Sequence, residues 1–298
     1  MDVSIIIVNY NTFSFAKATI ESVFEKTEGI MYEIILVDNN SPDNSGKQLK
    51  DFFNEKIIYL QNTANIGFGQ ANNEAVKIAS GRNLFFLNSD TLLLNNAVKI
   101  LSDYLDENPR VGCCGGNLFD VDRNPTNSFS RFFVPSIFNE INSLFFRIPE
   151  KLLYGKNTIY NNTNEPLKVA YITGADLMIR KNIFDILNGF DSDFFMYSEE
   201  AELEYRIKKM NYMIVSVPFA QIIHLEGKSF SNSLDRLKMI SVSRKIFLQK
   251  MYGQKMFVFN FLFRCRIVTR LFLFSILGNK EKIILWKQLY YENIICNI

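Results

Sequence analysis

Residues 83–90 read NLFFLNSD, and this stretch decides how the rest of the chain is interpreted. A short apolar run of this kind is typical of a buried strand. It ends in three small polar residues, and the last of them, Asp90, is a carboxylate. Ligands of open parallel sheets bind just past the carboxyl ends of the strands. We therefore expect Asn88 and Asp90 at the edge of a cleft, where they suit a hard divalent cation. A turn built from Asn, Ser and Asp is the alternative interpretation.

The sequence around this stretch alternates between strand and helix patterns. Four apolar runs have the length of buried strands: 3–8, 32–37, 57–60 and 83–87. Helical spacing and turn signals predict four helices that follow them: 13–26, 44–53, 70–79 and 95–107. Such alternation predicts a mostly parallel α/β sheet with helices on both faces and right-handed crossovers.

Three of the predicted strands end in Asn or Asp side chains. These residues are Asn9 and Asn11, Asp38 and Asn39, and Asn88 and Asp90. Because the carboxyl ends of parallel strands lie along one edge of a sheet, these polar groups should line one rim. Three coincident polar ends favour a nucleotide-type ligand over turn formation alone.

Beyond residue 110 the alternation stops. Residues 111–118 are a short, apolar and Gly-rich run. We expect strands at 170–179 and 212–217, the latter cut by Pro218, and helices at 137–147, 181–187 and from about residue 199 to 210. Glu199 and Glu200 stand in the first turn of that last helix, where the helix dipole alone would favour acids. His224 is the only histidine, and its local sequence fits a ligand and a structural polar residue equally well.

The composition excludes several classes of protein. A chain of 298 residues suits one large α/β domain or two smaller ones, and a net charge of +2 gives no reason to expect nucleic-acid binding. The four cysteines lack CxxC spacing, which predicts reduced thiols and no zinc site. The first residues lack the pattern of a secretory signal. We also find no GxGxxG after the first strand, as an NAD-binding enzyme would need.

The C-terminal segment is predicted to be helical and apolar. Residues 234–252 have the pattern of a basic amphipathic helix, and 256–277 are very apolar but contain Arg264, Arg266 and Arg270. Because an arginine at the bilayer centre costs at least about 2.5 kcal/mol, a membrane span is not expected. A helix lying in the membrane interface and a helix packed on the rest of the protein both remain open.

Eight motifs in this order resemble the GT-A-fold, inverting glycosyltransferases of family 2, especially their rhamnosyltransferase-like branch. They are SIIIVNYN (4–11), VDNNS (37–41), NIGF (65–68), LNSD (87–90), GA (174–175), GFD (189–191), FMYSEE (195–200, followed by Glu202-Leu203) and HLEGKS (224–229). The resemblance runs from residue 3 to about residue 229, and it is carried by the combination of these motifs.

The resemblance implies roles for particular residues. Asp90 and His224 would bind Mg²⁺ or Mn²⁺, with Asn88 standing where the family often has a first acid. Glu200, where Asp is commoner, would be the catalytic base beside Glu199. The donor nucleotide would be contacted by Asn9, Tyr10, Asn11, Asp38, Asn65, Gly67, Asn88 and Ser89.

The resemblance also implies an activity and a domain organisation. The donor would be a nucleotide diphosphate sugar (dTDP-rhamnose or a UDP-sugar), and the acceptor a lipid-linked or growing surface glycan. Residues 1–230 would form the catalytic domain, with a donor half at 1–110 and an acceptor half at 111–230. Beyond the resemblance, the apolar, arginine-containing pattern of the C-terminal segment predicts that residues 231–298 form a helical extension that contacts the inner face of the cell membrane from the cytoplasm. A catalytically inactive, sugar-nucleotide-binding assembly protein of the same fold is the alternative.

Overall fold

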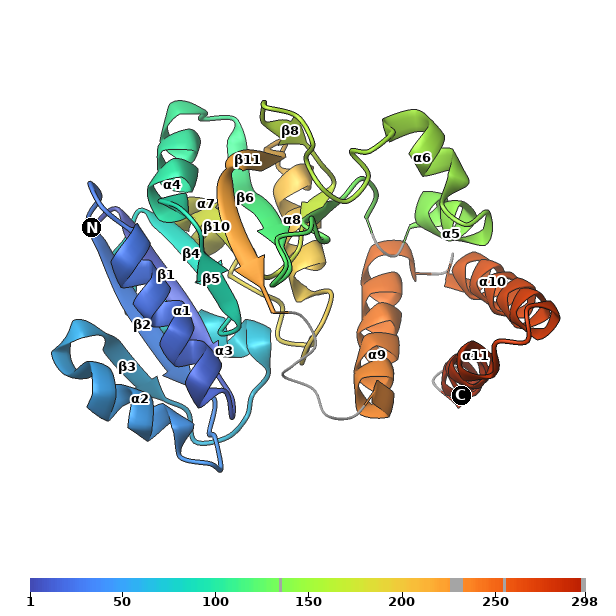
Figure 1. The fold of residues 1–298 in the computed structure, drawn as a ribbon, viewed down its shortest axis with the longest axis horizontal. Coiled ribbons are helices and arrows are strands. Elements are labelled where there is room, and N and C mark those ends of the chain that lie inside the picture. Colours follow the sequence, from blue (N-terminus) through green and yellow to red (C-terminus); the bar gives the residue numbers. More distant parts are fainter. Residues whose placement is uncertain (134–135, 226–232, 254–255, 296–298) are drawn as a thin grey trace.

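A nine-stranded sheet runs through the chain as far as His224 in the computed structural model, which describes residues 1–133, 136–225, 233–253 and 256–295 (Figure 1). The strand order is β3-β2-β1-β4-β10-β6-β11-β5, and β8 pairs with β11 outside this path. Part of the predicted motif at 224–229, from residue 226 on, lies outside the described residues.

The first half of the sheet is parallel, as predicted. Its strands are β1 (Val3–Asn9), β2 (Tyr32–Asp38), β3 (Ile58–Gln61) and β4 (Asn83–Leu87). The intervening elements are α1 (Phe13–Lys26), α2 (Ser45–Phe53), the short 3₁₀ helix η1 (Asn54–Lys56) and α3 (Phe68–Val76), and α4 (Ala97–Glu107) follows β4 and β5. The apolar strand runs are buried because helices cover both faces of the sheet.

Alternating side chains of β1 enter two separate cores. Ile5 and Ile7 pack in the core beneath α1, α2 and α4, whereas Ile6 packs in the core beneath α3, α7 (Lys181–Ile186) and α8 (Glu199–Lys209). The period of two along a strand sends neighbouring residues to opposite faces. The prediction of helices on both faces is therefore confirmed.

The second half of the sheet is mixed, so the prediction of a mostly parallel sheet is wrong there. β10 (Asp176–Arg180) is antiparallel to both β4 and β6 (Val111–Phe119). β11 (Met213–His224) is parallel to β6 but antiparallel to β5 (Thr91–Leu93) and β8 (Leu167–Lys168). The segment between β6 and β10 contains helices at 137–144 and 148–154, and the first of them packs against the C-terminal helix 256–276.

Two strand predictions need correction. β11 continues through Pro218, because a register irregularity between Ser216 and Gln221 removes the need for a ladder hydrogen bond there. The run at 170–179 is two strands: β9 (Tyr171–Ile172), which pairs with β7 (Phe129–Ser130), and β10 in the main sheet. The three residues between them, 173–175, connect the two sheets.

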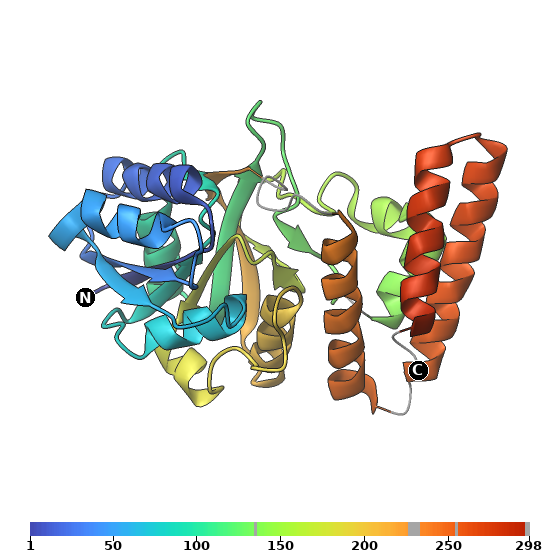
Figure 2. The same ribbon diagram turned by 90° about the horizontal axis from the view of Figure 1, so that it is seen from below.

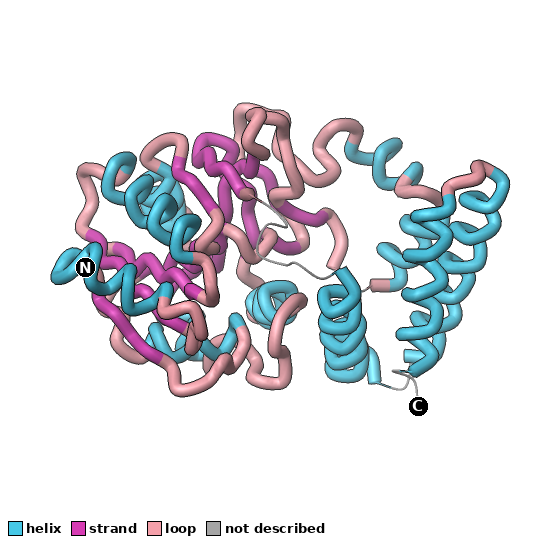
Figure 3. The backbone as a smooth tube through the Cα atoms, turned by 60° about the horizontal axis from the view of Figure 1, so that its bottom comes forward, coloured by secondary structure: helices cyan, strands magenta, loops and turns pink. Residues whose placement is uncertain are grey.

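Helices form the end of the molecule farthest from β3 (Figures 2 and 3). The predicted helix at 137–147 is present as α5 (Ile137–Leu144), and a second helix that was not predicted, α6 (Ile148–Tyr154), follows it. The C-terminal extension is present as α9 (Ser233–Tyr252), α10 (Met256–Ile276) and α11 (Lys280–Ile295), and α10 packs against α5, α9 and α11. Among the described helices, none combines the length and apolarity that crossing a bilayer requires.

Candidate functional site

Asn9 joins the carboxyl ends of β1 and β2. Its side chain is fully buried, and its amide donates to Oδ1 of Asp38 (2.7 Å), Oγ of Ser45 (2.8 Å) and Oγ of Ser41 (3.1 Å). Its carbonyl oxygen accepts from the Thr12 hydroxyl at 2.8 Å. The buried Asn9 side chain thus holds the end of β1 to the end of β2 and to the loop that follows β2. Contact of this residue with a nucleotide stays a prediction.

Asp38 is held at the end of β2 by a complete set of donors. Besides Asn9, the hydroxyl and backbone N–H of Ser41 donate to it at 2.6 and 3.1 Å, and Nε2 of Gln61 donates at 2.8 Å. Gly46 lies so close that an added Cβ would come within 2.2 Å of the Asp38 Cγ. The carboxylate is therefore fixed in one orientation at the rim of the sheet.

Asn39, one of the polar strand-end residues expected at the rim, organises the next loop, although the family resemblance gave it no role of its own. Its amide donates to Oδ1 of Asn65 (2.8 Å), and its carbonyl oxygen accepts from Asn62 (3.0 Å) and from the backbone N–H of Ile66 (3.2 Å). Its position in the run Asp38-Asn39-Asn40 was the only local signal. Asn39 therefore links β2 to the turn that contains Gly67.

Gly67 brings the turn at 65–68 against the loop that precedes α8. It has φ of +85°, and an added Cβ would lie 2.2 Å from the backbone oxygen of Phe195. The next residue, Phe68, donates its N–H to that same oxygen at 2.9 Å. Two predicted motifs, at 65–68 and 195–200, are thus in direct contact.

Two other predicted residues lie on the exposed side of this rim. Tyr10 is largely exposed, and Asn11 has a left-handed backbone with φ of +57°. The backbone N–H of Asn11 donates to Oγ of Ser41 at 3.0 Å. Both residues lie beside the group that fixes Asp38.

The turn after β4 is attached to three different elements. Asn88 donates its backbone N–H to the carbonyl oxygen of Ala175 at 3.0 Å. The Ser89 hydroxyl accepts from Thr12 at 3.1 Å, and its backbone oxygen accepts from Thr19 at 2.9 Å. Both Asn88 and Ser89 remain partly exposed at the rim.

Asp90 and His224 meet across the sheet. The distance from Nε2 of His224 to Oδ1 of Asp90 is 3.4 Å, and both side chains are mostly buried. The pairing of β5 with β11 sets Thr91 opposite His224, and Leu225 donates its N–H to the Asp90 carbonyl at 2.9 Å. The two residues that were predicted to bind a metal are therefore neighbours.

The donor set fits a divalent cation that a ligand helps to hold. One carboxylate oxygen and one imidazole nitrogen are suitable ligands for Mn²⁺, and the carboxylate also suits Mg²⁺. Within the described residues, no group of three or more His, Cys, Asp and Glu side chains could hold a metal. Asp90 and His224 would thus supply part of a coordination sphere, and phosphate or water oxygens the remainder.

Glu199 and Glu200 begin α8 behind a strained loop. Tyr197 and Ser198 have φ of +72° and +68°, in the left-handed region that non-glycine residues seldom occupy. Glu199 is buried, and burial together with the charge of Glu200 raises its pKa well above the ordinary value. Burial also raises the pKa of Glu200, although backbone N–H groups at the helix start oppose the shift.

Glu200 lies beside the break between β9 and β10. A Cβ added at Gly174 would be 3.6 Å from Cδ of Glu200, and the adjacent Ala175 holds the backbone of Asn88. One short segment therefore contacts both the acidic pair and the strand end that leads to Asp90. A partly exposed carboxyl with a raised pKa is suited to accept a proton.

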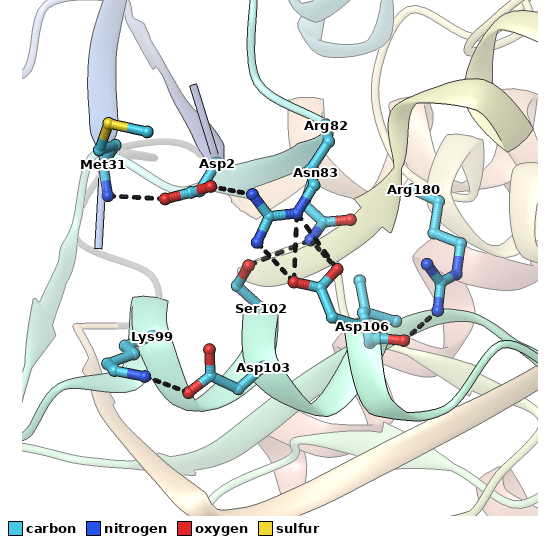
Figure 4. A network of polar contacts seen from close by, with 10 residues as sticks. Asp2, Met31, Arg82, Asn83, Lys99, Ser102, Asp103, Asp106 and Arg180 are labelled. Atoms are coloured by element: carbon cyan, nitrogen blue, oxygen red, sulfur yellow. Dashed lines mark hydrogen bonds and ion pairs between the residues drawn. The ribbon is translucent and has the colours of Figure 1, made fainter. Parts of the chain in front are cut away.

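A second polar cluster lies at the opposite edge of the sheet (Figure 4). Arg82 pairs with Asp106 and Asp2, and Arg180 donates to backbone oxygens around the end of α4. They border a hollow of about 470 Å³ that is far from the predicted site residues. Arg82 thus links the start of β1 to α4, and Arg180 links the end of β10 to the turn after α4.

Comparisons with known proteins identify relatives of the chain. The model of the family "Glycosyl transferase family 2" matches residues 4–186. The chain is 25% identical over 234 residues to the O-antigen biosynthesis protein RfbC of Myxococcus xanthus. The aligned region covers 76% of the chain but only 17% of that relative. It is 24% identical over 214 residues to the N-acetylglucosaminyl-diphospho-decaprenol L-rhamnosyltransferase of Mycobacterium tuberculosis (66% of the chain, 67% of the relative).

A solved structure has the same fold. The structure of GalNAc-T7 with UDP, GalNAc and Mn²⁺ superposes with a TM-score of 0.59 at 20% identity, covering 81% of this chain and 47% of that one. At this level of identity the likeness concerns the fold alone. It agrees with a GT-A-like α/β architecture for the sheet and its covering helices.

Proposed function

Because the chain belongs to glycosyl transferase family 2, we propose that it transfers a sugar from a nucleotide diphosphate sugar to a hydroxyl group of a lipid-linked or growing surface glycan. The donor is dTDP-rhamnose or a UDP-sugar. The relatives named for O-antigen synthesis and for decaprenol-linked rhamnosyl transfer support this class of acceptor. Residues 1–110 form the donor half, 111–230 the acceptor half, and 231–298 the helical extension.

One observation carries the proposal. The segment at 173–175 packs against Glu200 through Gly174 and holds the backbone of Asn88 through Ala175. The residue that we assign as proton acceptor and the strand end that we assign to the metal thus both contact one short segment, which supports the assignment. Transfer from a nucleotide diphosphate requires these two functions close together, because the attacking and leaving oxygens lie on opposite sides of one carbon.

The donor is bound and oriented by the rim of the parallel half-sheet. We assign contact with the base or ribose to Asp38, which would exchange one of its present donors, such as Gln61, for a donor of the ligand, while Asn9 and Asn39 keep the surrounding backbone in place. Tyr10, Asn11, Asn65, Gly67 and Ser89 border the same rim. Asp90 and His224 would hold Mg²⁺ or Mn²⁺, which would neutralise the negative charge that develops on the departing diphosphate.

Glu200 accepts the proton of the acceptor hydroxyl. The acceptor oxygen forms a bond to the anomeric carbon as the bond from that carbon to the diphosphate oxygen breaks, and the proton moves to the Glu200 carboxylate. A single displacement with one base inverts the configuration at the anomeric carbon. Glu199, buried and with a raised pKa, serves as the neutral neighbour that lets Glu200 carry the negative charge.

The proposal is tested first by ligand binding. A thermal-shift screen of UDP, dTDP and GDP and of their sugar conjugates, with and without Mn²⁺, should give metal-dependent stabilisation by one nucleotide. Product formation with that donor and a lipid-linked acceptor then separates an enzyme from a sugar-nucleotide-binding assembly protein. Folded protein that binds none of the nucleotides would contradict the proposal.

A further inference from the structure

Exposed apolar side chains gather at one end of the molecule. Of the 28 large hydrophobic residues that are exposed in the described part of the chain, 8 lie within 137–153 and 9 within 257–291. These ranges comprise α5, α6, α10 and α11, which lie together beyond α9 in both ribbon views (Figures 1 and 2). We call the exposed surface of these four helices the apolar end.

Helix α10 is apolar on two opposite faces. Phe259, Phe263 and Ile267 are buried, and they repeat every four residues along the face that packs inside the protein. A second row is exposed at similar spacing, namely Phe257, Phe261, Val268, Phe272 and Ile276. A helix between protein and water normally has one apolar and one polar face, so the second row indicates a partner other than water.

Contacts between polar and aromatic groups fix the α5–α6 hairpin to α10. Arg270 donates to the backbone oxygen of Ser143, and its guanidinium lies 3.4 Å from the ring centre of Phe146. Arg266 is 3.3 Å from Glu140 at the start of α5. The hairpin and the C-terminal helices therefore present their exposed apolar residues as one unit.

The acids of the hairpin are turned inward. Glu140 is 1% exposed and is paired with Arg244 at 3.2 Å as well as with Arg266. Glu150, also 1% exposed, accepts from Arg147 and from Asn142, both at 2.8 Å. Neither carboxylate contributes negative charge to the outer surface of the apolar end.

The charges that remain on this surface are almost all positive. Glu281 is the one exposed acid among the described side chains of the four helices. The exposed basic residues of the same helices are Lys151, Arg264, Lys280, Lys282 and Lys287. In the full sequence, residues 1–232 contain 21 basic and 28 acidic residues, whereas 233–298 contain 12 and 3. An anionic surface would therefore attract the C-terminal helices, to which the α5–α6 hairpin is fixed, and repel the remainder of residues 1–232.

We propose that the apolar end is a docking surface for an anionic lipid bilayer, and that the α5–α6 hairpin contributes to it together with α10 and α11. Exposed Phe and Leu beside Lys and Arg are the composition of helices that lie in the membrane interface. A second copy of the chain fits less well, because two such positive surfaces would repel each other. The inference rests on the proposed function only for its purpose, which is to bring the site to a lipid-linked acceptor.

The test is co-flotation of the full chain with vesicles. Wild-type protein should float with phosphatidylcholine vesicles that contain phosphatidylglycerol, less with pure phosphatidylcholine, and less at high salt. The double variant F261E/F272E on α10 and the variant L152E on α6 should each lower the bound fraction by about tenfold or more. The control I186E introduces the same charge at an exposed apolar position on α7 and should bind as wild type does.

Three outcomes would overturn the proposal. One is wild-type protein that fails to float with either vesicle. Another is an L152E variant that binds as wild type while F261E/F272E does not, which would remove the hairpin from the surface. The third is a concentration-dependent dimer in light scattering that F261E/F272E abolishes, which would make a second copy the occupant. Nucleotide binding, measured in parallel without vesicles, reports on the proposed function independently.

Discussion

Nε2 of His224 lies 3.4 Å from Oδ1 of Asp90, although β11 and the turn after β4 are far apart in the sequence. If both groups help to hold a cation against the donor diphosphate, D90N and H224A should each weaken nucleotide binding in Mn²⁺. We expect a loss of at least about tenfold, or about 1.4 kcal/mol, and little change in EDTA. Calorimetry with the nucleotide identified by screening measures both values.

The matched control for these variants is D51N, which removes an exposed carboxylate on α2. It should leave nucleotide affinity unchanged in Mn²⁺ and in EDTA. Equal affinity of D90N and wild type under both conditions would remove Asp90 from the metal site.

E200Q should abolish transfer while nucleotide binding survives. Glutamine has nearly the same shape as glutamate but cannot accept the hydroxyl proton, and a general base typically contributes about 10²–10⁴-fold to the rate. Single-turnover transfer and nucleotide titration measure the two properties separately. E107Q, at the exposed end of α4, is the control, and full activity in E200Q would assign the base elsewhere.

The rate of transfer should depend on the ionisation of Glu200. Burial raises the pKa of this carboxyl, and only the ionised form accepts a proton. The value of kcat/KM should therefore rise with pH through a pKa above that of an ordinary glutamate, and the residual rate of E200Q should lack this rise. A profile that turns at the ordinary glutamate pKa, or a rise that persists in E200Q, would contradict the assignment.

The buried Glu204 carboxyl should make the free energy of unfolding smaller at neutral and alkaline pH than at acidic pH. It is fully buried, which raises its pKa well above the ordinary value, and it accepts the backbone N–H of Ile172 at 2.8 Å. Because the unfolded chain ionises first, the free energy of unfolding falls as pH rises from the ordinary pKa towards the folded-state pKa, by about 1.4 kcal/mol per unit.

The variant E204Q keeps an acceptor for Ile172 but cannot ionise. It should match wild type in chemical denaturation below the ordinary glutamate pKa and exceed it at higher pH. E165Q, at an exposed position, should show no such pH-dependent difference. A deficit of E204Q that is equal at every pH would mean that packing, not charge, is the important property.

G67A, in the turn at 65–68, should lower the free energy of unfolding more than G155A does at the end of α6. Both glycines have positive φ, but an added Cβ at Gly155 meets nothing within 4 Å, whereas at Gly67 it would meet the oxygen of Phe195. Strain of this kind costs about 1–3 kcal/mol, so thermal unfolding should rank the variants. Equal losses would mean that the close contact adds nothing to the cost of the backbone conformation.

The parallel half of the sheet could be predicted from the sequence because its signals are local. Each apolar run is followed by a polar strand end and a helix, and β1 and β4 lie within a residue or two of their predicted bounds. The direction of β10 could not be predicted in this way. It depends on pairing with β4, about ninety residues earlier, and the helices between the two strands, α4, α5 and α6, do not fix their relative direction.

The site was predicted in outline but not in its internal connections. Polar strand ends identified Asn9 and Asp38, yet only the structure shows that Asn9 donates to Asp38 and that Asn39 joins the two loops. Side-chain direction at the end of a strand depends on packing from other elements, which no local pattern encodes. The second helix of the hairpin, α6, was missed because it is short and its apolar residues Ile148, Leu152 and Leu153 are exposed.

The contact of Gly67 with Phe195 joins the two halves of the proposed catalytic domain, so that neither side of the contact can move without the other. The turn that would receive the donor and the loop that leads into the acidic pair share one backbone hydrogen bond, from Phe68 to Phe195. A donor that displaces the turn must therefore displace the start of α8 as well. Such a connection favours an ordered kinetic sequence, in which the sugar nucleotide enters first and the acceptor meets a site already assembled around it.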